Sequence, residues 1–533
     1  MPKILINEID GTSPGTPGQY SNYAVLITGF TKRDSTEDRS SDKIQPDSNG
    51  VYEFSSSTDF EKIIGIASSK IETSGGASAD YHYGNQMAYE LLKLGYPVIY
   101  CPINSINEMD DEDFWEIFKD KSSYDFRFVS HGLLESSDIP VGESKEELTA
   151  RQESVSEAIS QLKTIGKANG FDWDTNSDIT SLSETIISAL NTAYDEIKAT
   201  YVGFEKLDEV YKTYTEAYNG TKAEAEELVS KIATVDDRYV TSDKINAING
   251  HIANLAKYKK NETAAIPGRG DCVALIELDE KLYTNKATKR PEILIISGIN
   301  KMTQINGDNG KYCAMTVPSV YYQMDPKKKF PGAFHYLACF ANSIQSGFAE
   351  WYAAAGYTRG VSSYVVDHTS VKLGEIAINA LEPRNYVDQT KEPKFSCNVI
   401  ANFRGSYYLW GNRTAHEIKS AAGGNDLTAS HFLNIRQLCS TIKKQCYVAC
   451  RRFTFDPNSD TLWFNFVNAI KPTLELMKAD QGVRDYKIVK VFTDKKATLK
   501  AKIRIVPIEA VEDFDLEVWL EDSLGEVAVT VNG

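Results

Sequence analysis

Three cysteines carry the clearest hint of metal chemistry in this 533-residue chain. Cys439, Cys446 and Cys450 are seven and four positions apart, which places them on one face of a helix. A structural zinc ion takes four ligands, usually from paired cysteines in short turns, and the sequence offers no evident fourth ligand. We therefore favour apolar packing as the role of these thiols and predict no metal site.

Other polar motifs give no better support to an enzyme. Asp367-His368 could form a catalytic pair, but no G-x-S-x-G nucleophile motif accompanies it. The Gly-rich residues 11–18 and 74–76 lack the Lys-Ser/Thr ending of a phosphate-binding loop. The cell-adhesion tripeptide Arg269-Gly270-Asp271 is best explained by chance. The sequence predicts no enzymatic activity and no cofactor.

Composition and charge place the chain among folded globular proteins. Hydrophobic residues make up 42% of it and aromatic residues 11%, enough to bury several cores. The net charge is −16, from 74 acidic and 58 basic residues, whereas a nucleic-acid-binding surface is basic. No apolar run has the length of a membrane span, and no apolar leader is evident at the N-terminus. We expect no nucleic-acid partner, no stable membrane insertion, and reduced, buried thiols.

Residues 1–22 predict an N-terminal arm. Residues 3–10 predict a short strand, in which Ile4 and Ile6 share one face. The Gly- and Pro-rich residues 11–18 predict a flexible or extended linker. Such a strand can pair with the sheet of another molecule or fold back on its own domain, and the residues alone leave both options open.

Residues 23–140 and 263–394 predict a middle α/β domain, because helical patterns and buried apolar runs alternate there. Strands are predicted at 23–28, 96–102, 272–277 and 292–296, and helices at 57–66, 84–94 and 330–341.

Residues 141–262 predict a surface-exposed helical insertion. Apolar residues recur there at three- and four-residue spacing, and Gly and Pro are nearly absent except at expected helix ends. The stretch holds 22 acidic and 14 basic residues, half of the net charge of the chain. A solvated bundle of antiparallel helices is favoured over a specific receptor-binding module.

Residues 395–533 predict a C-terminal α+β domain. It begins with a strand pair around Gly405, followed by helices at 433–448 and 460–479. Pro472 is expected to kink the second helix or to begin a fresh segment, and Gly482 lies where the end of the helix is expected. Strands are then predicted at 499–505, 514–520 and 526–531.

The predicted C-terminal strands alternate between apolar and charged residues. Lys500, Lys502 and Arg504 face away from Ile503 and Ile505, whereas 514–520 alternates Phe514, Leu516, Val518 and Leu520 with Asp515 and Glu517. Opposite charges on neighbouring strands contribute about 0.2–1 kcal/mol per pair. A terminal apolar strand with an open edge is an aggregation hazard, and a neighbouring subunit is a natural candidate to cover it.

Five motifs, in this order, resemble those of contractile-tail sheath proteins. Leu409-Trp410-Gly411-Asn412-Arg413-Thr414 is similar to their "V-W-G-A-R-T" strand end. The other four, similar to "N-x-R-R-L", "F-E-P-N-x-x-x-L-W", "G-I-x-D-Y-x-V" and "V-x-I-x-P", begin at Asn434, Phe455, Gly482 and Ile503. The resemblance covers residues 330–533 well and is looser in the middle domain.

The resemblance implies an α+β multidomain protein: an α/β middle domain with a helical insertion, and a C-terminal α+β sheath domain whose sheet is completed by strands from neighbouring subunits. It implies a homo-oligomer of stacked rings around a tail tube, with a baseplate and a tail terminator as further partners. The expected location is the virion tail, after assembly in the host cytoplasm. The resemblance assigns strand exchange to the termini; the residues expected to take part are Ile4, Ile6, Ile503, Ile505, Leu516, Val518, Leu520, Val527 and Val529.

In that family a C-terminal helix holds the tube, which makes Lys471 and Lys478 the candidate tube-facing residues here. The sheath contracts and drives the tube through the host envelope. Two other classes remain open. One is another tail or baseplate structural protein, and the other is a cytosolic α/β enzyme.

Overall fold

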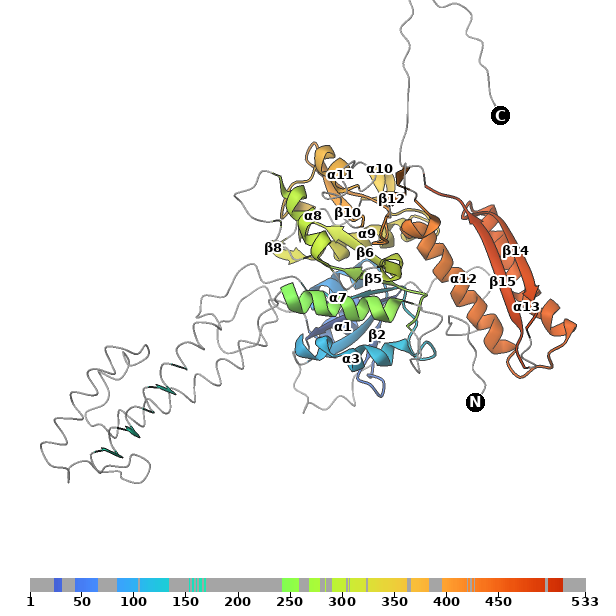
Figure 1. Cartoon of the computed structure of the whole chain (residues 1–533), viewed down its shortest axis with the longest axis horizontal. Coiled ribbons are helices and arrows are strands. Elements are labelled where there is room, and N and C mark those ends of the chain that lie inside the picture. Colours follow the sequence, from blue (N-terminus) through green and yellow to red (C-terminus); the bar gives the residue numbers. More distant parts are fainter. Residues whose placement is uncertain are drawn as a thin grey trace, which may run out of the picture.

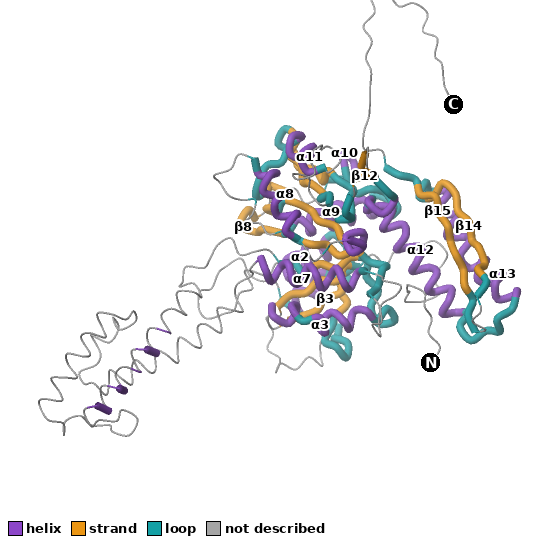
Figure 2. The backbone as a smooth tube through the Cα atoms, viewed as in Figure 1, coloured by secondary structure: helices purple, strands orange, loops and turns teal. Residues whose placement is uncertain are grey.

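A computed structural model describes 24–30, 44–65, 84–103, 106–133, 242–257, 268–278, 290–302, 307–322, 325–361, 366–382, 395–418, 427–493 and 497–510, with a few short stretches between them. These residues form a large body around one sheet, with a smaller C-terminal unit beside it (Figures 1 and 2). The predicted strand at 3–10 and most of the predicted insertion lie outside the described residues.

The large body is built on an eight-stranded sheet in the order β11-β10-β6-β5-β4-β1-β3-β2. The six strands from β10 to β3 run parallel, and β11 and β2 are antiparallel edges. The strands are β1 (Val25–Phe30), β2 (Tyr52–Phe54), β3 (Val98–Ile103), β4 (Phe128–Ser130), β5 (Val273–Ile276), β6 (Cys313–Val317), β10 (Asn398–Phe403) and β11 (Ser406–Trp410).

Helices cover both faces of this sheet, because its central strands are apolar on both sides. In β1, Leu26 belongs to the core on one face, while Val25 and Ile27 belong to the core on the other. The first face is covered by α3 (Glu112–Glu116), α7 (Ser242–Ala256), α8 (Pro291–Lys301) and α11 (Glu375–Leu381). The second is covered by α1 (Ser57–Ile63), α2 (Gly84–Lys93) and α9 (Gly332–Gln345).

Shorter elements complete the large body. They are the three-stranded sheet β8-β7-β9 (Asp325–Phe330, Val320–Tyr322 and Val366–Thr369), the pair β12 (Ser420–Ala421) and β13 (Gly424–Asn425), and α10 (Gly356–Arg359). Short 3₁₀ turns lie at Ile106–Asp110, Ile117–Lys119, Gly307–Tyr312 and Ala429–His431.

One predicted strand is wrong, because residues 292–296 lie in helix α8. Pro291 occupies the first turn of that helix, where its missing N–H is not needed. Ile295, Ile296 and Ile299 are buried against the sheet. A short run of β-branched residues has the same apolar pattern in a buried strand and a buried helix face, and here tertiary packing selects the helix.

The structure differs from the expected domain boundaries at two points. Helix α7 falls within the predicted insertion, yet Ile245, Ile248 and Ile252 are buried in the core of the large body. The predicted hairpin around Gly405 is confirmed, but β10 pairs in parallel with β6. It thus extends the large sheet instead of joining the C-terminal strands. Both segments were assigned by composition and chain order, which carry no information about long-range packing.

Two helix-start glycines offer a test of how tightly the large body is packed. A Cβ added at Gly332, the first residue of α9, would lie 2.0 Å from the carbonyl oxygen of Thr316. A Cβ at Gly374, before α11, would have no neighbour within 4 Å.

We expect Gly332→Ala to lower the free energy of unfolding by about 1–3 kcal/mol or more, because the backbone must shift. The matched variant Gly374→Ala should change it by less than about 1 kcal/mol. Chemical denaturation of both variants measures this, and equal effects would contradict the packing described.

Candidate functional site

The C-terminal unit is the candidate site for a structural role. It consists of α12 (Leu433–Arg452), α13 (Asp460–Ala479), β14 (Val483–Val491) and β15 (Lys500–Pro507). The predicted helix at 460–479 is confirmed at both ends, and the Ser459 hydroxyl caps it by accepting from the Leu462 N–H at 3.3 Å. The two strands form an antiparallel sheet that packs on α13 (Figure 1).

One face of the β14–β15 sheet is apolar and packs inward. Ile503 lies opposite Ile488 and Ile505 opposite Tyr486, and these four side chains pack against a core that includes Leu474. The alternation predicted for residues 499–505 is therefore confirmed, because exposed and half-buried residues alternate along β15.

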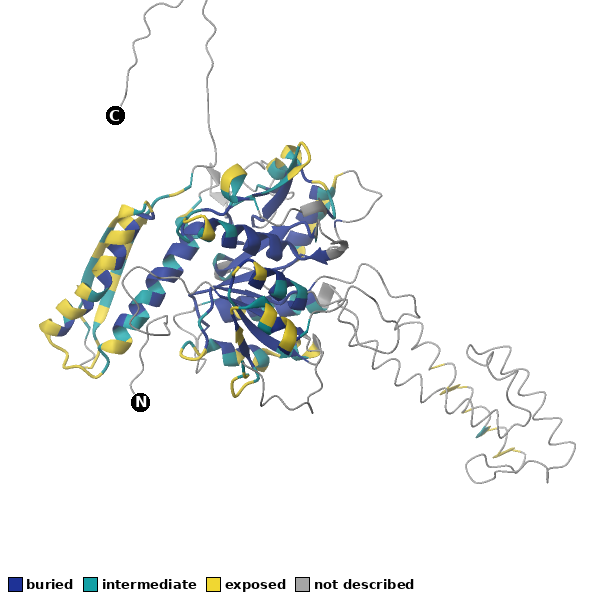
Figure 3. Ribbon diagram, turned by 180° about the vertical axis from the view of Figure 1, so that it is seen from behind, coloured by how far each residue is buried: buried dark blue, intermediate teal, exposed yellow. Residues whose placement is uncertain are grey.

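The other face of this sheet is exposed and basic, and we call it the basic face. It carries Lys487 opposite Arg504, with Lys500 and Lys502 opposite valines. Exposed residues gather on this unit (Figure 3). The sequence predicted the basic row of β15 but missed Lys487, although the alternation within 483–491 would have revealed it.

The sheet has only these two strands among the described residues, so each strand has one edge without a backbone partner there. A two-stranded sheet is marginal by itself, and an open edge is a ready template for a further strand. Ile503 and Ile505 lie in β15, as predicted. The other predicted exchange residues, Ile4, Ile6, Leu516, Val518, Leu520, Val527 and Val529, lie outside the described residues.

The candidate tube-facing lysines lie on the exposed side of α13. Lys471 is exposed, and Lys478 pairs with Asp485 of β14 at 3.0 Å. This hydrogen bond lowers the pKa of Asp485 below its ordinary value. The same helix exposes Phe464 and Leu476, 63% and 45% accessible respectively, so α13 presents apolar as well as basic groups to solvent.

A buried polar network fixes α12 to the large body. The Arg127 side chain, only 2% exposed, donates to Glu350 at 3.2 Å, to Gln437 at 3.2 Å and to Thr441 at 3.0 Å. Lys444 of α12 pairs with Asp125 and donates to the Phe126 carbonyl. Removing one partner of a buried ion pair costs about 3–5 kcal/mol, so α12 is held firmly. No local motif could predict contacts between residues about 310 positions apart.

Trp351 is a second link between the large body and the C-terminal unit. Its ring belongs to the core of the C-terminal unit, and its indole N–H donates to the Asp480 carbonyl at 3.0 Å. A Cβ at Gly482 would lie 2.8 Å from that ring. Gly482 was predicted to terminate α13, but the left-handed residue after the helix is Gln481, with φ +55°. Gly482 instead allows the close approach of Trp351.

Several of the groups with possible chemistry are buried in the described part of the chain. Arg269 and Asp271 are 0% exposed and pair at 3.0 Å, so the adhesion tripeptide is a core ion pair. Burial raises the pKa of Cys101 and Cys397 to about 12, far from a reactive thiolate. No group of His, Cys, Asp and Glu within the described ranges is arranged to hold a metal.

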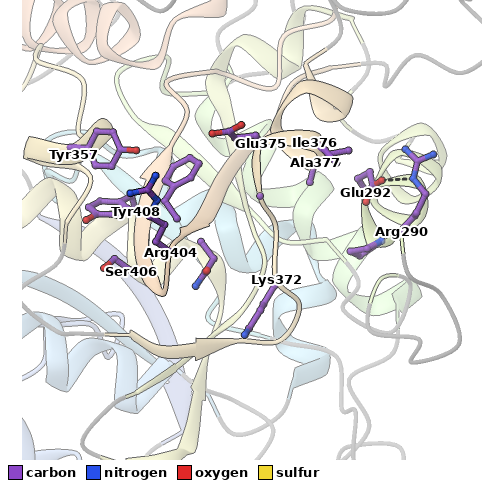
Figure 4. Close-up of a pocket in the computed structure, with 14 residues that line it drawn as sticks. Arg290, Glu292, Tyr357, Lys372, Glu375, Ile376, Ala377, Arg404, Ser406 and Tyr408 are labelled. Carbon is purple, nitrogen blue, oxygen red and sulfur yellow. Dashed lines mark hydrogen bonds and ion pairs between the residues drawn. The ribbon is translucent and has the colours of Figure 1, made fainter.

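An open pocket of about 950 Å³ lies beside the hairpin β10–β11, α8 and α11 (Figure 4). Tyr357, Tyr408 and Arg404 lie on one side of it, and the Arg290–Glu292 ion pair, at 2.7 Å, lies on the other. The lining holds no nucleophile with an adjacent base. None of the described helices combines the length and apolarity of a membrane-crossing segment.

Comparisons with solved structures identify the fold. Over 98% of this chain and 99% of the other, the fold is similar to a chain in the cryo-EM structure of the anti-feeding prophage (AFP) baseplate, with 11% identity and a TM-score of 0.51. Chains in the contracted PVC sheath complex of an extracellular contractile injection system, and in the contracted AFP helical sheath, are similar at 11% identity and a TM-score of 0.49. No family model matches this chain, and no curated protein matches it.

The resemblance to contractile sheath proteins predicted from the sequence is thereby confirmed at the level of the fold. The chain shares its fold with a chain of the AFP baseplate structure. Its α+β class, with a large mixed sheet, is confirmed as well.

The contact between Gly482 and Trp351 gives a paired test of the C-terminal unit. Gly482→Ala should lower the free energy of unfolding by about 1–3 kcal/mol, because it displaces the ring. Gln481→Gly, one position earlier, should raise it by about 1 kcal/mol, because it relieves a left-handed conformation. Thermal and urea unfolding measure both, and changes of the same sign would contradict this geometry.

Two buried histidines predict how stability depends on pH. Burial lowers the pKa of His131 and His335 to about 4, whereas unfolded histidine titrates near about 6.5. The unfolded chain therefore binds more protons, and the free energy of unfolding should fall as pH drops from about 6.5 to 4.

His335→Gln removes one of these two titrating side chains. The free energy of unfolding of the variant should therefore fall less steeply than that of the parent protein as pH drops from about 6.5 to 4. Urea denaturation at several pH values checks this. A slope identical to that of the parent protein would show that His335 does not titrate as described.

Proposed function

We propose that this protein is a structural subunit of a contractile tail sheath. It polymerises helically around a tail tube and contracts to drive the tube through the host envelope. The single observation that carries this proposal is the two-stranded sheet of the C-terminal unit, with one apolar face covered by α13 and two edges free of partners within the described residues. The fold shared with a contractile-particle component supports it.

Strand addition is the proposed assembly contact. Terminal strands of neighbouring copies, containing Ile4 and Ile6 or Leu516, Val518, Leu520, Val527 and Val529, would extend the sheet next to Ile503 and Ile505. Backbone hydrogen bonds supply the strength, at about 1 kcal/mol each, and alternating side chains supply the register. Residues 11–18, rich in Gly and Pro, would let subunits rotate while their strands remain paired.

A sheath must transmit force without unfolding. The buried Arg127 network and Trp351 both hold the C-terminal unit to the large body, so a strand that pulls on β15 pulls on the whole subunit. The proposed energy source is a difference between two packings of the subunits. The tail tube would contact the exposed side of α13, around Lys471 and Lys478, while a baseplate and a tail terminator would contact the ends of the polymer.

A baseplate subunit is the second candidate. The similar AFP structure is a six-fold baseplate, and a chain with this fold could close into a small ring. Negative-stain microscopy of the purified protein separates the two proposals. Long ribbed cylinders support a sheath, and closed rings support a baseplate component.

Truncation tests strand exchange. A chain that lacks residues 1–10, and a second in which residues 511–533 are replaced by an equal length of Gly and Ser, should both fold. We expect unchanged circular dichroism, because neither segment belongs to the described cores. Both variants should sediment as monomers and form no cylinders. Cylinders of normal appearance from either variant would refute the role of that terminus.

A further inference from the structure

The pocket beside the β10–β11 hairpin is bordered by a cluster of aromatic rings. Phe403, Tyr408 and Trp410 come from the two strands of the hairpin, and the register of the strands places them on the same face of the sheet. The ring of Tyr357, from α10, packs edge-to-face on Tyr408 and Trp410, with ring centroids 4.8 Å and 5.3 Å apart. Tyr357 is still 61% exposed. An aromatic surface therefore faces solvent at the pocket.

The position of Tyr357 is fixed by the edge strand. The Leu409 N–H of β11 donates to the carbonyl of Gly360, the residue that follows α10, at 2.8 Å. A Cβ added at Gly360 would lie 2.4 Å from the Leu409 carbonyl oxygen, so glycine is needed for this close approach. The same hydrogen bond occupies the outer edge of β11 at Leu409, where a further strand therefore cannot pair.

Charged side chains complete the lining of the pocket. Arg290 and Glu292 form an ion pair at 2.7 Å on the side opposite the rings (Figure 4). Lys372, Glu375 and Arg404 lie nearer to the rings. Within the described residues, no ion pair joins Lys372 or Arg404 to an acid. The lining thus holds three basic and two acidic residues, and two of its cations are available to a ligand.

Arg404 occupies an uncommon backbone position for its residue type. Arg404 and Gly405 form the turn between β10 and β11, with φ of +52° and +91°. Turns with two positive φ values favour Asn-Gly, and non-glycine residues in this conformation concentrate at binding sites. The backbone gives no reason for an arginine here, whereas its side chain lines the pocket.

The lining restricts the class of ligand. A purely apolar molecule would remove charged side chains from water without giving them partners, which is costly. A polyphosphate would meet the carboxylates of Glu292 and Glu375. An extended peptide would need the strand edge that is occupied at Leu409. A sugar chain meets each condition, because its C–H groups pack on aromatic faces and its hydroxyls both donate and accept.

We propose that this pocket binds an oligosaccharide that carries carboxylate groups. One sugar ring packs on Tyr357 and Tyr408, and a carboxylate pairs with Arg404 and Lys372. The volume of about 950 Å³ lies in the range of small-molecule sites. This inference goes beyond the proposed function and does not depend on it, because all the lining residues belong to the large body.

Calorimetric titration of the purified full chain tests the proposal with two probes of equal length. One is a trimer of galacturonic acid, and the other is maltotriose, which has no carboxylate. We expect the acidic trimer to bind about threefold to fivefold more tightly than maltotriose at about 0.05 M NaCl, as for exposed ion pairs. Raising NaCl to about 0.5 M should remove most of this difference, because ions screen exposed charges.

Two variants separate the roles of the ring and the cation. Tyr357→Ala should weaken the binding of both trimers by about tenfold or more, because it removes the exposed ring. Arg404→Gln should weaken only the acidic trimer, to about the affinity of maltotriose. The controls are Phe464→Ala, which removes a ring of similar exposure from α13, and Arg484→Gln, which removes an exposed cation from β14. Both controls should bind like the parent protein.

Two kinds of result would overturn the proposal. If neither trimer binds, or if Tyr357→Ala binds like the parent, the pocket is not a sugar site. If the two trimers bind equally well at low salt, or if Arg404→Gln has no effect, the carboxylate is not recognised. Whether the chain forms cylinders bears only on the proposed function and leaves each of these outcomes unchanged.

Discussion

An open strand edge is the constraint on which this structure depends. Backbone N–H and C=O groups need partners, and a sheet of two strands leaves half of each strand's groups on its outer edge. Globular proteins usually cover such edges, or prevent further strands from pairing there with bulges, prolines or charges. Here α13 covers the apolar face of the sheet, while the edges stay free of partners among the described residues. The charges lie on the opposite face, where they do not block pairing at the edge. Within the described residues, the edges of this sheet are therefore open to a further strand.

The rest of the molecule holds that sheet in place. The Trp351 side chain extends from the large body into the core of the C-terminal unit. Arg127 of the large body and Lys444 of α12 hold α12 to the large body. The contacts of Arg127 and Lys444 are polar and buried, so they are specific in geometry and costly to break. The eight-stranded sheet behind them is covered on both faces and presents Arg127 at the start of β4. Force applied to β15 therefore passes through α13 and α12 to the centre of the large sheet.

The sequence predicted the local elements well where their periodicity was strong. The limits of α13, the hairpin around Gly405 and the alternation along β15 follow from patterns within about twenty residues. The failures have a common cause. Helix α8 was predicted as a strand, and α7 and the hairpin β10–β11 were assigned to other domains, because tertiary neighbours decide these placements. The Arg127 network could not be predicted at all. Its partners come from segments far apart in the chain, and no local spacing marks them.

The β14–β15 sheet and the C-terminal residues carry charges of opposite sign. Lys487 lies opposite Arg504 on a two-stranded sheet, which is an unfavourable pairing, whereas the last 23 residues contain seven acidic residues and no basic residue. Either feature alone could be a solvated surface, but together they are complementary in sign and in alternation.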